Sequence, residues 1–214
     1  QMVKIPIDPR FSIGENAQRY FKKYQKQKAA RDMAGVQRAQ TLTELSYLEG
    51  QLDNLRKCAG DAELSELVEE LREQGYLKRE KGAKKSPKYA ASKPLCFVSS
   101  DGNARIYVGK NDTLTLRFAE GGDFWLHTKN IPGSHVIVKC EGAPSEQTLL
   151  EAATLAAYYS KARVGENIPV DYTLRKYVKK PAGAKPGMVI YTTYRTAYVT
   201  PEETLVKTLK PTAL

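Results

Sequence analysis

The apolar residues in the first third of the chain follow a helical spacing. Ser12 and Glu15 match a capping box, Ser-x-x-Glu, and no proline interrupts the segment that follows, so the pattern predicts one long helix over residues 12–59. Its second half carries leucines at the 3-4-3 spacing of a coiled-coil seam, namely Leu45, Leu48, Leu52 and Leu55. We therefore predict a helical coiled-coil arm, whose partner helix is expected before Gln1.

A second and shorter helix is predicted after Gly60, which breaks the first one. Asp61 is the expected N-cap and Gly75 the expected end. The apolar residues between them fall on one helical stripe: Leu64, Leu67, Val68 and Leu71. Residues 1–77 are thus expected to form one helical region.

A basic segment, KREKGAKKSPKYAASK, separates this region from the rest of the chain. Residues 78–93 carry seven basic residues and one acidic residue, a net charge of +6. Their glycine, serine and proline content is typical of a linker. Two interpretations stay open: a well-solvated connector, or an arm that contacts phosphate groups.

After residue 94 the pattern changes to short alternating segments that are typical of strands. LCFVSS and ARIYVG flank Asp101-Gly102-Asn103, a composition that favours a hairpin turn. One helix is predicted over residues 145–163, and IPVDYTLRKYVKK, MVIYTT and TAYVT are predicted strands, the last two joined at Tyr194-Arg195. Strands with hairpin turns and one main helix indicate an α+β domain with a mostly antiparallel sheet over residues 94–214.

Charge and cysteine content narrow the class of partner and the compartment. The net charge of +10 favours an acidic partner, with nucleic acid first and an anionic membrane second, although an ordinary solvated surface also fits. The three cysteines lie far apart without a CxxC pair, which argues against a disulfide framework and fits the cytoplasm. We find no signal peptide and no apolar run long enough to span a membrane.

The run DFWLHTKNIPGSHVIVK, residues 123–139, carries the most chemistry. Side chains in a strand alternate between two faces, so we predict one apolar face that packs on a core and one face that meets a partner. The second face would hold Asp123, Trp125, His127 and Lys129. A second strand begins at His135 after an Ile-Pro-Gly turn, which brings the two histidines close together.

Neither a metal site nor a catalytic site is predicted for this strand. Asp123 and His127 lie about 13 Å apart along an extended strand, which is too far to hold one ion. No nucleophilic serine or reactive cysteine accompanies either histidine, so no catalytic dyad is expected, and we assign no cofactor. Two roles stay open for the histidines: they tie turns together by hydrogen bonds, or they contact a partner.

Nucleic-acid binding accounts for more of these residues together. Trp125 offers a surface on which a base can stack, and a proline- and glycine-rich loop after Arg175 carries lysines suited to phosphate contacts. Cations also follow the predicted helix, where the helix dipole alone would favour them. The predicted RNA-binding residues are Asp123, Trp125, His127, Lys129, His135, Lys161, Arg163, Lys176, Lys179, Lys180 and Lys185.

Several motifs resemble one known family. VGKN, DFWLHTKNIPGSHVIVK, EAATLAAYYSKAR, IPVDYT and KKPAGAKPGMVIYTTYRTAYVTP, in this order, resemble the NFACT-R domain. The preceding ENAQRYFKKYQKQK resembles the middle coiled-coil region of the same proteins. The family is the RqcH-like, or fibronectin-binding protein A-like, group, which is related to eukaryotic NEMF.

The resemblance implies a ribosome quality-control factor. Such factors bind a large ribosomal subunit that still holds peptidyl-tRNA, recruit alanyl-tRNA, and support untemplated C-terminal tailing of the stalled peptide. The ribosome itself forms the peptide bond, so the factor needs no active site. We expect the principal tRNA contacts in a preceding region, so that this chain supplies docking to ribosomal RNA and ribosomal proteins.

One segment departs from the family pattern. Members usually read V-G-[KR]-N-N-x-Q-N-D-x-L-T, whereas this chain reads VGKN followed directly by DTLT, from Val108 to Thr115. Four residues of a polar loop are missing, so we assign no RNA-binding role to it.

A second interpretation comes from relatives described as fibronectin-binding surface proteins, which would make the chain part of an adhesin. Aromatic residues and arginine are enriched in protein interfaces as well as in RNA sites. Salt distinguishes the two, because binding through phosphates weakens steeply as salt rises. A pure coiled-coil scaffold fits less well, since it leaves the Trp-His strand unexplained.

Overall fold

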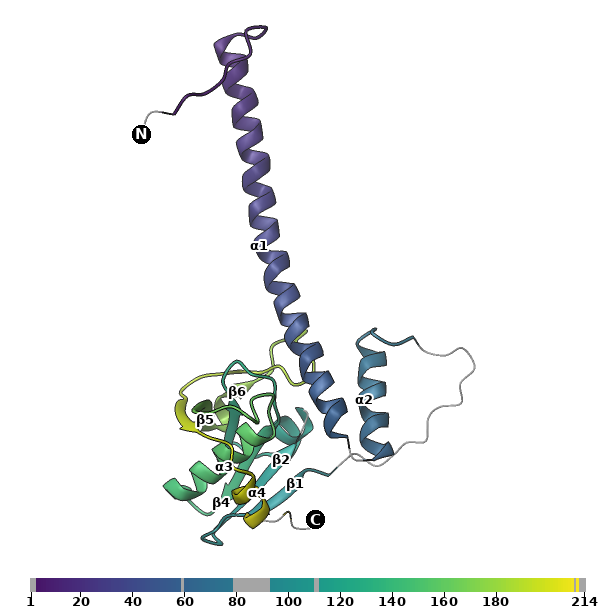
Figure 1. The fold of residues 1–214 in the computed structure, drawn as a ribbon, viewed down its shortest axis with the longest axis vertical. Coiled ribbons are helices and arrows are strands. Elements are labelled where there is room, and N and C mark those ends of the chain that lie inside the picture. Colours follow the sequence, from purple (N-terminus) through teal and green to yellow (C-terminus); the bar gives the residue numbers. More distant parts are fainter. Residues whose placement is uncertain (1–2, 59, 79–92, 110–111, 210, 212–214) are drawn as a thin grey trace. The chain divides into compact units, whose positions relative to one another are not determined.

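The computed structural model describes residues 3–58, 60–78, 93–109, 112–209 and 211 (Figure 1). The chain divides into two compact units, Gln1–Leu45 and Ser46–Leu214. The helix α1 (Ile13–Lys57) begins in the first unit and ends in the second. It confirms the long helix predicted over residues 12–59, and each end differs from the prediction by at most two residues. The predicted linker, residues 78–93, lies outside the described residues except for its two end residues.

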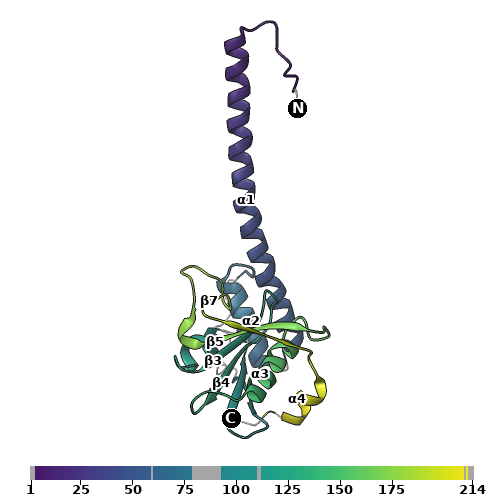
Figure 2. The same ribbon diagram turned by 90° about the vertical axis from the view of Figure 1, so that its left-hand side faces the viewer.

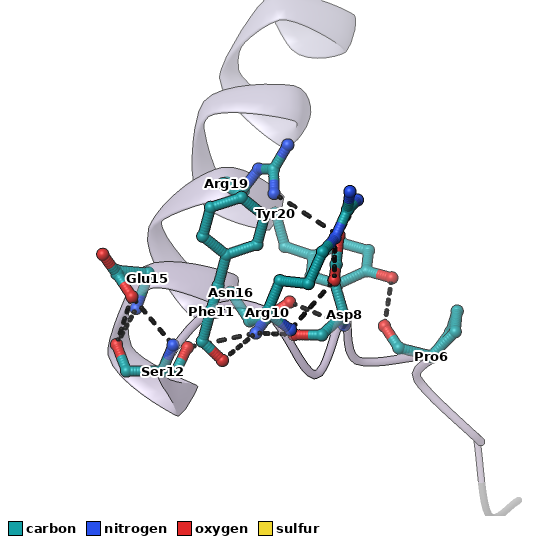
Figure 3. A network of polar contacts seen from close by, with 9 residues as sticks. All are labelled: Pro6, Asp8, Arg10, Phe11, Ser12, Glu15, Asn16, Arg19 and Tyr20. Atoms are coloured by element: carbon teal, nitrogen blue, oxygen red, sulfur yellow. Dashed lines mark hydrogen bonds and ion pairs between the residues drawn. The ribbon is translucent and has the colours of Figure 1, made fainter.

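The start of α1 confirms the predicted capping box (Figure 3). The Ser12 backbone N–H donates to Glu15 Oε2 at 2.8 Å, and the Glu15 N–H donates to Ser12 Oγ at 3.2 Å. One turn further, the buried Asn16 amide donates to the backbone carbonyls of Asp8 and Phe11 at 3.0 and 3.1 Å. These bonds satisfy backbone groups ahead of the helix and fix the loop that leads into it.

The helix α2 (Asp61–Glu73) confirms the predicted second helix but corrects its cap. Gly60 is the N-cap and Asp61 the first helical residue, so no side chain caps this end. Gly75 has a φ of +81°, a left-handed conformation that ends the helix and favours glycine.

The last turns of α1 pack against α2 within the second unit. Tyr47 is buried, and its hydroxyl donates to Glu70 Oε1 at 2.9 Å. The predicted seam leucines remain 37–52% exposed, and their partner helix stays a prediction.

Six strands form one antiparallel sheet, which confirms the predicted α+β class (Figure 2). The strand order is β1-β2-β4-β3-β5-β8, and each neighbouring pair is antiparallel. The strands are β1 (Leu95–Val98), β2 (Ala104–Gly109), β3 (Phe124–Thr128), β4 (His135–Cys140), β5 (Ile168–Leu174) and β8 (Arg195–Val199). The predicted hairpin at residues 101–103 joins β1 to β2.

Two helices pack on one face of the sheet: α3 (Glu146–Tyr158) and the short α4 (Glu203–Leu209). Leu126, from the predicted core face of β3, is fully buried beneath α3, and Ser145 caps α3 by accepting from the Thr148 N–H at 3.1 Å. The helix ends five residues earlier than predicted. Its following residues instead bond to the turn before β4, where the Lys161 N–H donates to the Pro132 carbonyl at 2.9 Å.

The opposite face of the sheet is also covered, which the sequence pattern did not predict. Residues beyond β5 form a 3₁₀ turn, η2 (Arg175–Tyr177), and a small two-stranded sheet of β6 (Val178–Lys179) and β7 (Ile190–Tyr191). A π-helix, η1 (Thr113–Phe118), joins them. The resulting second core contains Cys96, Tyr107, Leu114, Trp125, Ile137 and Val178.

These elements correct two strand predictions. The predicted strand from residue 168 to 180 is interrupted at η2, after which the chain turns into β6. The segments MVIYTT and TAYVT enter different sheets, because β7 pairs with β6 whereas β8 pairs with β5. Thr193, with a φ of 52°, redirects the chain between them.

Candidate nucleic-acid interface

Trp125 lies on the face of β3 that the alternation predicted, but this face is buried. Its exposed fraction is 0%, and the Tyr191 ring on β7 lies 4.8 Å from it, between centroids. The prediction of an exposed stacking surface at Trp125 is therefore wrong. Alternation shows which residues share a face, but it cannot show that segments 50 residues further along the chain cover that face.

The two histidines meet as predicted, with ring centroids 5.2 Å apart. His135 is buried, and its Nδ1 lies 2.6 Å from Thr115 Oγ1 in η1, so the predicted contact of His135 with a partner is wrong. His127 is half-buried, stacks on Trp125, and places Nε2 at 3.3 Å from the Gly133 carbonyl oxygen. These contacts support the alternative role, in which the histidines tie turns together.

Burial also fixes the charge of this pair. It lowers the pKa of His127, and it lowers the pKa of His135 to about 3, with nearby His127 as a smaller cause. Both rings are therefore neutral near neutral pH and supply no positive charge for phosphate. Among the residues that the structure describes, no three His, Cys, Asp or Glu side chains are grouped as metal ligands.

Asp171 is a buried carboxylate that sequence reasoning missed. It faces His127 across β3 and β5, and accepts hydrogen bonds from the hydroxyls of Tyr191 at 2.8 Å and Thr196 at 2.6 Å. Burial, followed by the bond to Asp171, raises the pKa of Tyr191. A signal existed in IPVDYT, where the alternation of β5 places Asp171 on the same face as Thr173.

Two predicted residues at the ends of the β3 face are tied into ion pairs. Lys129 Nζ lies 3.6 Å from Asp171 Oδ1 and 5.0 Å from the centroid of the Tyr194 ring. Asp123 Oδ2 lies 3.1 Å from Lys139 Nζ and accepts the Glu120 N–H at 2.8 Å. The structure thus brings Asp123, Trp125, His127, Lys129 and His135 together as one face, most of whose polar groups are bound internally.

The basic loop and the end of α3 are also engaged. Lys180 Nζ lies 2.5 Å from Asp112 Oδ2, and Lys161 Nζ lies 2.9 Å from Glu49 Oε1. Lys185 Nζ lies 4.5 and 4.8 Å from the ring centroids of Tyr76 and Tyr47.

Three other predicted cations are exposed. The Arg163 guanidinium lies 3.9 Å above the Tyr158 ring. Lys176 and Lys179 have no carboxylate partner among the described residues. These cations are the ones best placed to meet a phosphate, and their contact with RNA stays a prediction.

Sequence comparison assigns the sheet domain to an RNA-binding class. Residues 93–192 match the family described as the NFACT protein RNA binding domain, and residues 1–90 match the NFACT N-terminal and middle domains. The chain belongs to the RqcH-like NFACT family.

Two relatives of known name support the family assignment. The protein named Rqc2 homolog RqcH from Bacillus subtilis (strain 168) is 43% identical, over 97% of this chain and 37% of that protein. The protein of the same name from Streptococcus suis (strain 05ZYH33) is 41% identical, over 97% of this chain and 38% of that protein. The chain therefore spans little more than a third of these relatives.

A solved structure has the same fold. It is the C-terminal part of the fibronectin/fibrinogen-binding protein from Streptococcus suis, which is 42% identical with a TM-score of 0.80. The similarity covers 92% of this chain and 80% of that one. Although α1 is long, neither it nor any other helix in the described part of the chain carries an apolar stretch able to cross a bilayer.

Proposed function

We propose that this chain is the ribosome-docking part of a cytoplasmic ribosome quality-control factor. The observation that carries the proposal is the match of residues 93–192 to an RNA-binding domain, within a chain 41–43% identical to two RqcH proteins. The complete factor binds large ribosomal subunits that still carry peptidyl-tRNA. It recruits alanyl-tRNA for untemplated C-terminal tailing, and the ribosome forms each peptide bond, so this chain catalyses no reaction.

The surface chemistry supports a docking role. The chain carries a net charge of +10, and Lys176 and Lys179 project from η2 and β6, which are anchored on the second core through Val178. Cations on a rigid support suit phosphate contacts, which position a partner without reading its bases. Because both faces of the sheet are covered, these contacts come from turns and strand ends and not from the sheet face.

Co-sedimentation with purified large ribosomal subunits tests this proposal. We expect binding that is stronger for subunits carrying peptidyl-tRNA and that weakens steeply as salt rises, because counterions are released from phosphates on binding. Replacement of Lys176 and Lys179 by alanine should weaken binding, whereas the matched pair Lys23→Ala and Lys28→Ala on α1 removes the same charge and serves as the control. Absence of binding at low salt, or binding insensitive to salt, would contradict the proposal.

A fibronectin-binding surface protein is the second candidate. It is favoured by one observation, the name of the solved Streptococcus suis relative, a fibronectin/fibrinogen-binding protein. Exposed aromatic residues on and beside the edge strand β8, Tyr194 and Tyr198, would suit such a protein interface. Surface plasmon resonance on immobilised fibronectin would then show salt-insensitive binding that Tyr198→Ala weakens, and lack of binding would remove this candidate.

A further inference from the structure

Three exposed cations have no carboxylate partner among the described residues: Arg105, Arg117 and Lys176. They come from three separate segments, namely β2, the end of η1, and η2. The turn of residues 120–123, which precedes β3, follows η1 and is bonded to η2, and Lys139 on β4 links it to β2.

The first side of this turn is built from β2 and β4. Arg105 and Lys139 are direct partners across these antiparallel strands, so their side chains lie about 5 Å apart at Cβ on the same face. Lys139 Nζ reaches the turn, 3.1 Å from Asp123 Oδ2 and 3.4 Å from Glu120 Oε1. Both carboxylates of the turn thus pair with Lys139, and Arg105 beside it has no carboxylate within ion-pair distance among the described residues.

The second side of the turn is built from η2. The Lys176 backbone N–H donates to the Gly121 carbonyl at 3.2 Å, and the Arg175 N–H donates to the Asp123 carbonyl at 2.8 Å. These two backbone bonds fix the base of the Lys176 side chain against the turn. The Lys176 Nζ lies 5.1 Å from the Tyr177 ring centroid and is otherwise exposed.

Phe118 adds an exposed aromatic ring beside these cations. Its exposed fraction is 38%, yet the ring is held in place, with the Tyr107 ring at 4.7 Å and an interplanar angle of 65°. Lys139 Nζ lies 4.9 Å from its centroid. Arg117 is its neighbour in sequence at the end of η1.

Lys139 is neutralised within the protein, but the other groups of this region are not. Arg105 and Lys139 are like charges directly opposite each other on neighbouring strands, which is unfavourable, and Glu120 and Asp123 offset it by pairing with Lys139. Arg105, Arg117 and Lys176 have no carboxylate within ion-pair distance among the described residues, and part of the Phe118 ring stays exposed. These exposed groups are available to a partner.

We propose that Arg105, Arg117, Phe118 and Lys176 form a binding surface for single-stranded RNA. A base stacks on Phe118, and the cations around it contact the adjoining phosphates, the combination used by sequence-tolerant single-strand binders. This inference rests on the proposed function, since it locates the RNA contact of the same domain. Only Lys176 belongs to the residues predicted from the sequence to bind RNA.

Fluorescence anisotropy with a labelled single-stranded oligouridine tests the surface on the 214-residue chain between about 50 and 200 mM salt. The triple replacement Arg105→Ala, Arg117→Ala and Lys176→Ala should weaken binding. It should also flatten the slope of log affinity against log salt by about 2, since each phosphate contact on a single strand contributes roughly 0.7. Phe118→Ala should weaken binding about tenfold and leave the slope unchanged, because stacking carries no charge.

A matched triple on α1, Lys23→Ala, Lys28→Ala and Arg38→Ala, removes the same charge and should leave the slope unchanged. Circular dichroism checks that each variant folds, and Phe118→Leu keeps an apolar contact with Tyr107 while removing the stacking surface. Unweakened binding by the cation triple, or equal weakening by the α1 triple, overturns this surface but not the proposed function. Failure of the unmodified chain to bind oligouridine also overturns this surface, whereas the proposed function is overturned only if the chain does not co-sediment with large ribosomal subunits. Tighter binding to polyglutamate that is independent of Phe118 overturns this surface and identifies an acidic protein partner instead.

Discussion

Trp125, His127 and His135 form an aromatic layer inside the second core. The His127 ring stacks on Trp125 with an interplanar angle of 13°, and His135 meets both rings edge-on. Asp171 closes the layer by binding the hydroxyl of Tyr191. Two of these groups hold covering segments on the sheet: His135 holds η1 through Thr115, and Asp171 holds β7 through Tyr191. The Trp-His strand is thus an anchoring surface for other parts of the same chain.

Replacement of Trp125 by alanine is expected to destabilise the protein. It removes a fully buried side chain and leaves a cavity between β3 and β7, which costs about 3–5 kcal/mol in the free energy of unfolding. Urea unfolding followed by circular dichroism measures this loss, with Tyr198→Ala, an exposed aromatic on β8, as the control. A Trp125→Ala variant as stable as its parent would show that the second core contributes little.

Acid is expected to loosen the same layer. Burial lowers the pKa of His135 to about 3, from about 6.5 in an unfolded chain. Between these values the unfolded chain binds a proton that the folded protein does not, so the free energy of unfolding rises with pH and is lost as pH falls below about 6.5. The expected loss at pH 5 is about 2 kcal/mol.

Urea unfolding at about pH 7 and pH 5 measures this dependence, and His135→Gln provides the comparison. The glutamine does not titrate, so the variant should be less stable at neutral pH but should lose less on acidification. Some pH dependence should remain, because burial also lowers the pKa of His127. A variant that keeps the full dependence of the parent would assign it to other groups.

At the scale of elements, the loop between β6 and β7 is held by its lysines. Lys180 pairs with Asp112 at the start of η1, and the Gly187 N–H donates to the same carboxylate at 2.9 Å. Lys185 lies against the stacked rings of Tyr47 and Tyr76, whose centroids are 5.8 Å apart. The sequence suggests that this basic loop contacts phosphate, but the structure uses it in part to contact α1 at Tyr47 and the segment after α2 at Tyr76.

Lys185→Ala is expected to release this loop from the helices. Loss of the cation–π contacts should lower the free energy of unfolding by about 1–2 kcal/mol and raise amide hydrogen exchange in the loop. Lys179→Ala, which removes an exposed lysine from the same segment, should change neither quantity. In a double-mutant cycle with Tyr76→Ala, strict additivity would disprove the coupling between the lysine and the tyrosine.

Most helices and strands could be predicted from the sequence, but the segments that cover the sheet face at Trp125 could not. Period-3.6 leucines, the capping box and strand alternation predicted α1, α2 and most of the sheet, because these signals are local. The bonds of Lys161 to Pro132 and of His135 to Thr115 join segments far apart in the chain. No local pattern encodes such contacts, so the exposure of Trp125 and the partners of the lysines could not be predicted.

At the scale of the whole molecule, the second unit joins the end of α1 to the sheet domain. Glu49 pairs with Lys161, Tyr47 contacts Lys185, and Gly50 approaches Pro132 in the turn before β4. The family matches divide the chain between residues 90 and 93, close to the predicted boundary. The contacts divide it between Leu45 and Ser46. The boundary from the family matches therefore lies more than 40 residues after the boundary from the contacts.

A comparison of two fragments decides which boundary governs stability. A fragment of residues 46–214 keeps the contacts of Lys185 and Lys161, whereas a fragment of residues 93–214 loses both. We expect the shorter fragment to be less stable by roughly 2 kcal/mol, mostly from the cation–π contacts, because a largely exposed ion pair contributes at most about 1 kcal/mol. Urea unfolding of both fragments measures the difference. Equal stability would mean that the last turns of α1 and the helix α2 do not stabilise the sheet domain. The boundary near residue 90 would then be the one that delimits the stable unit.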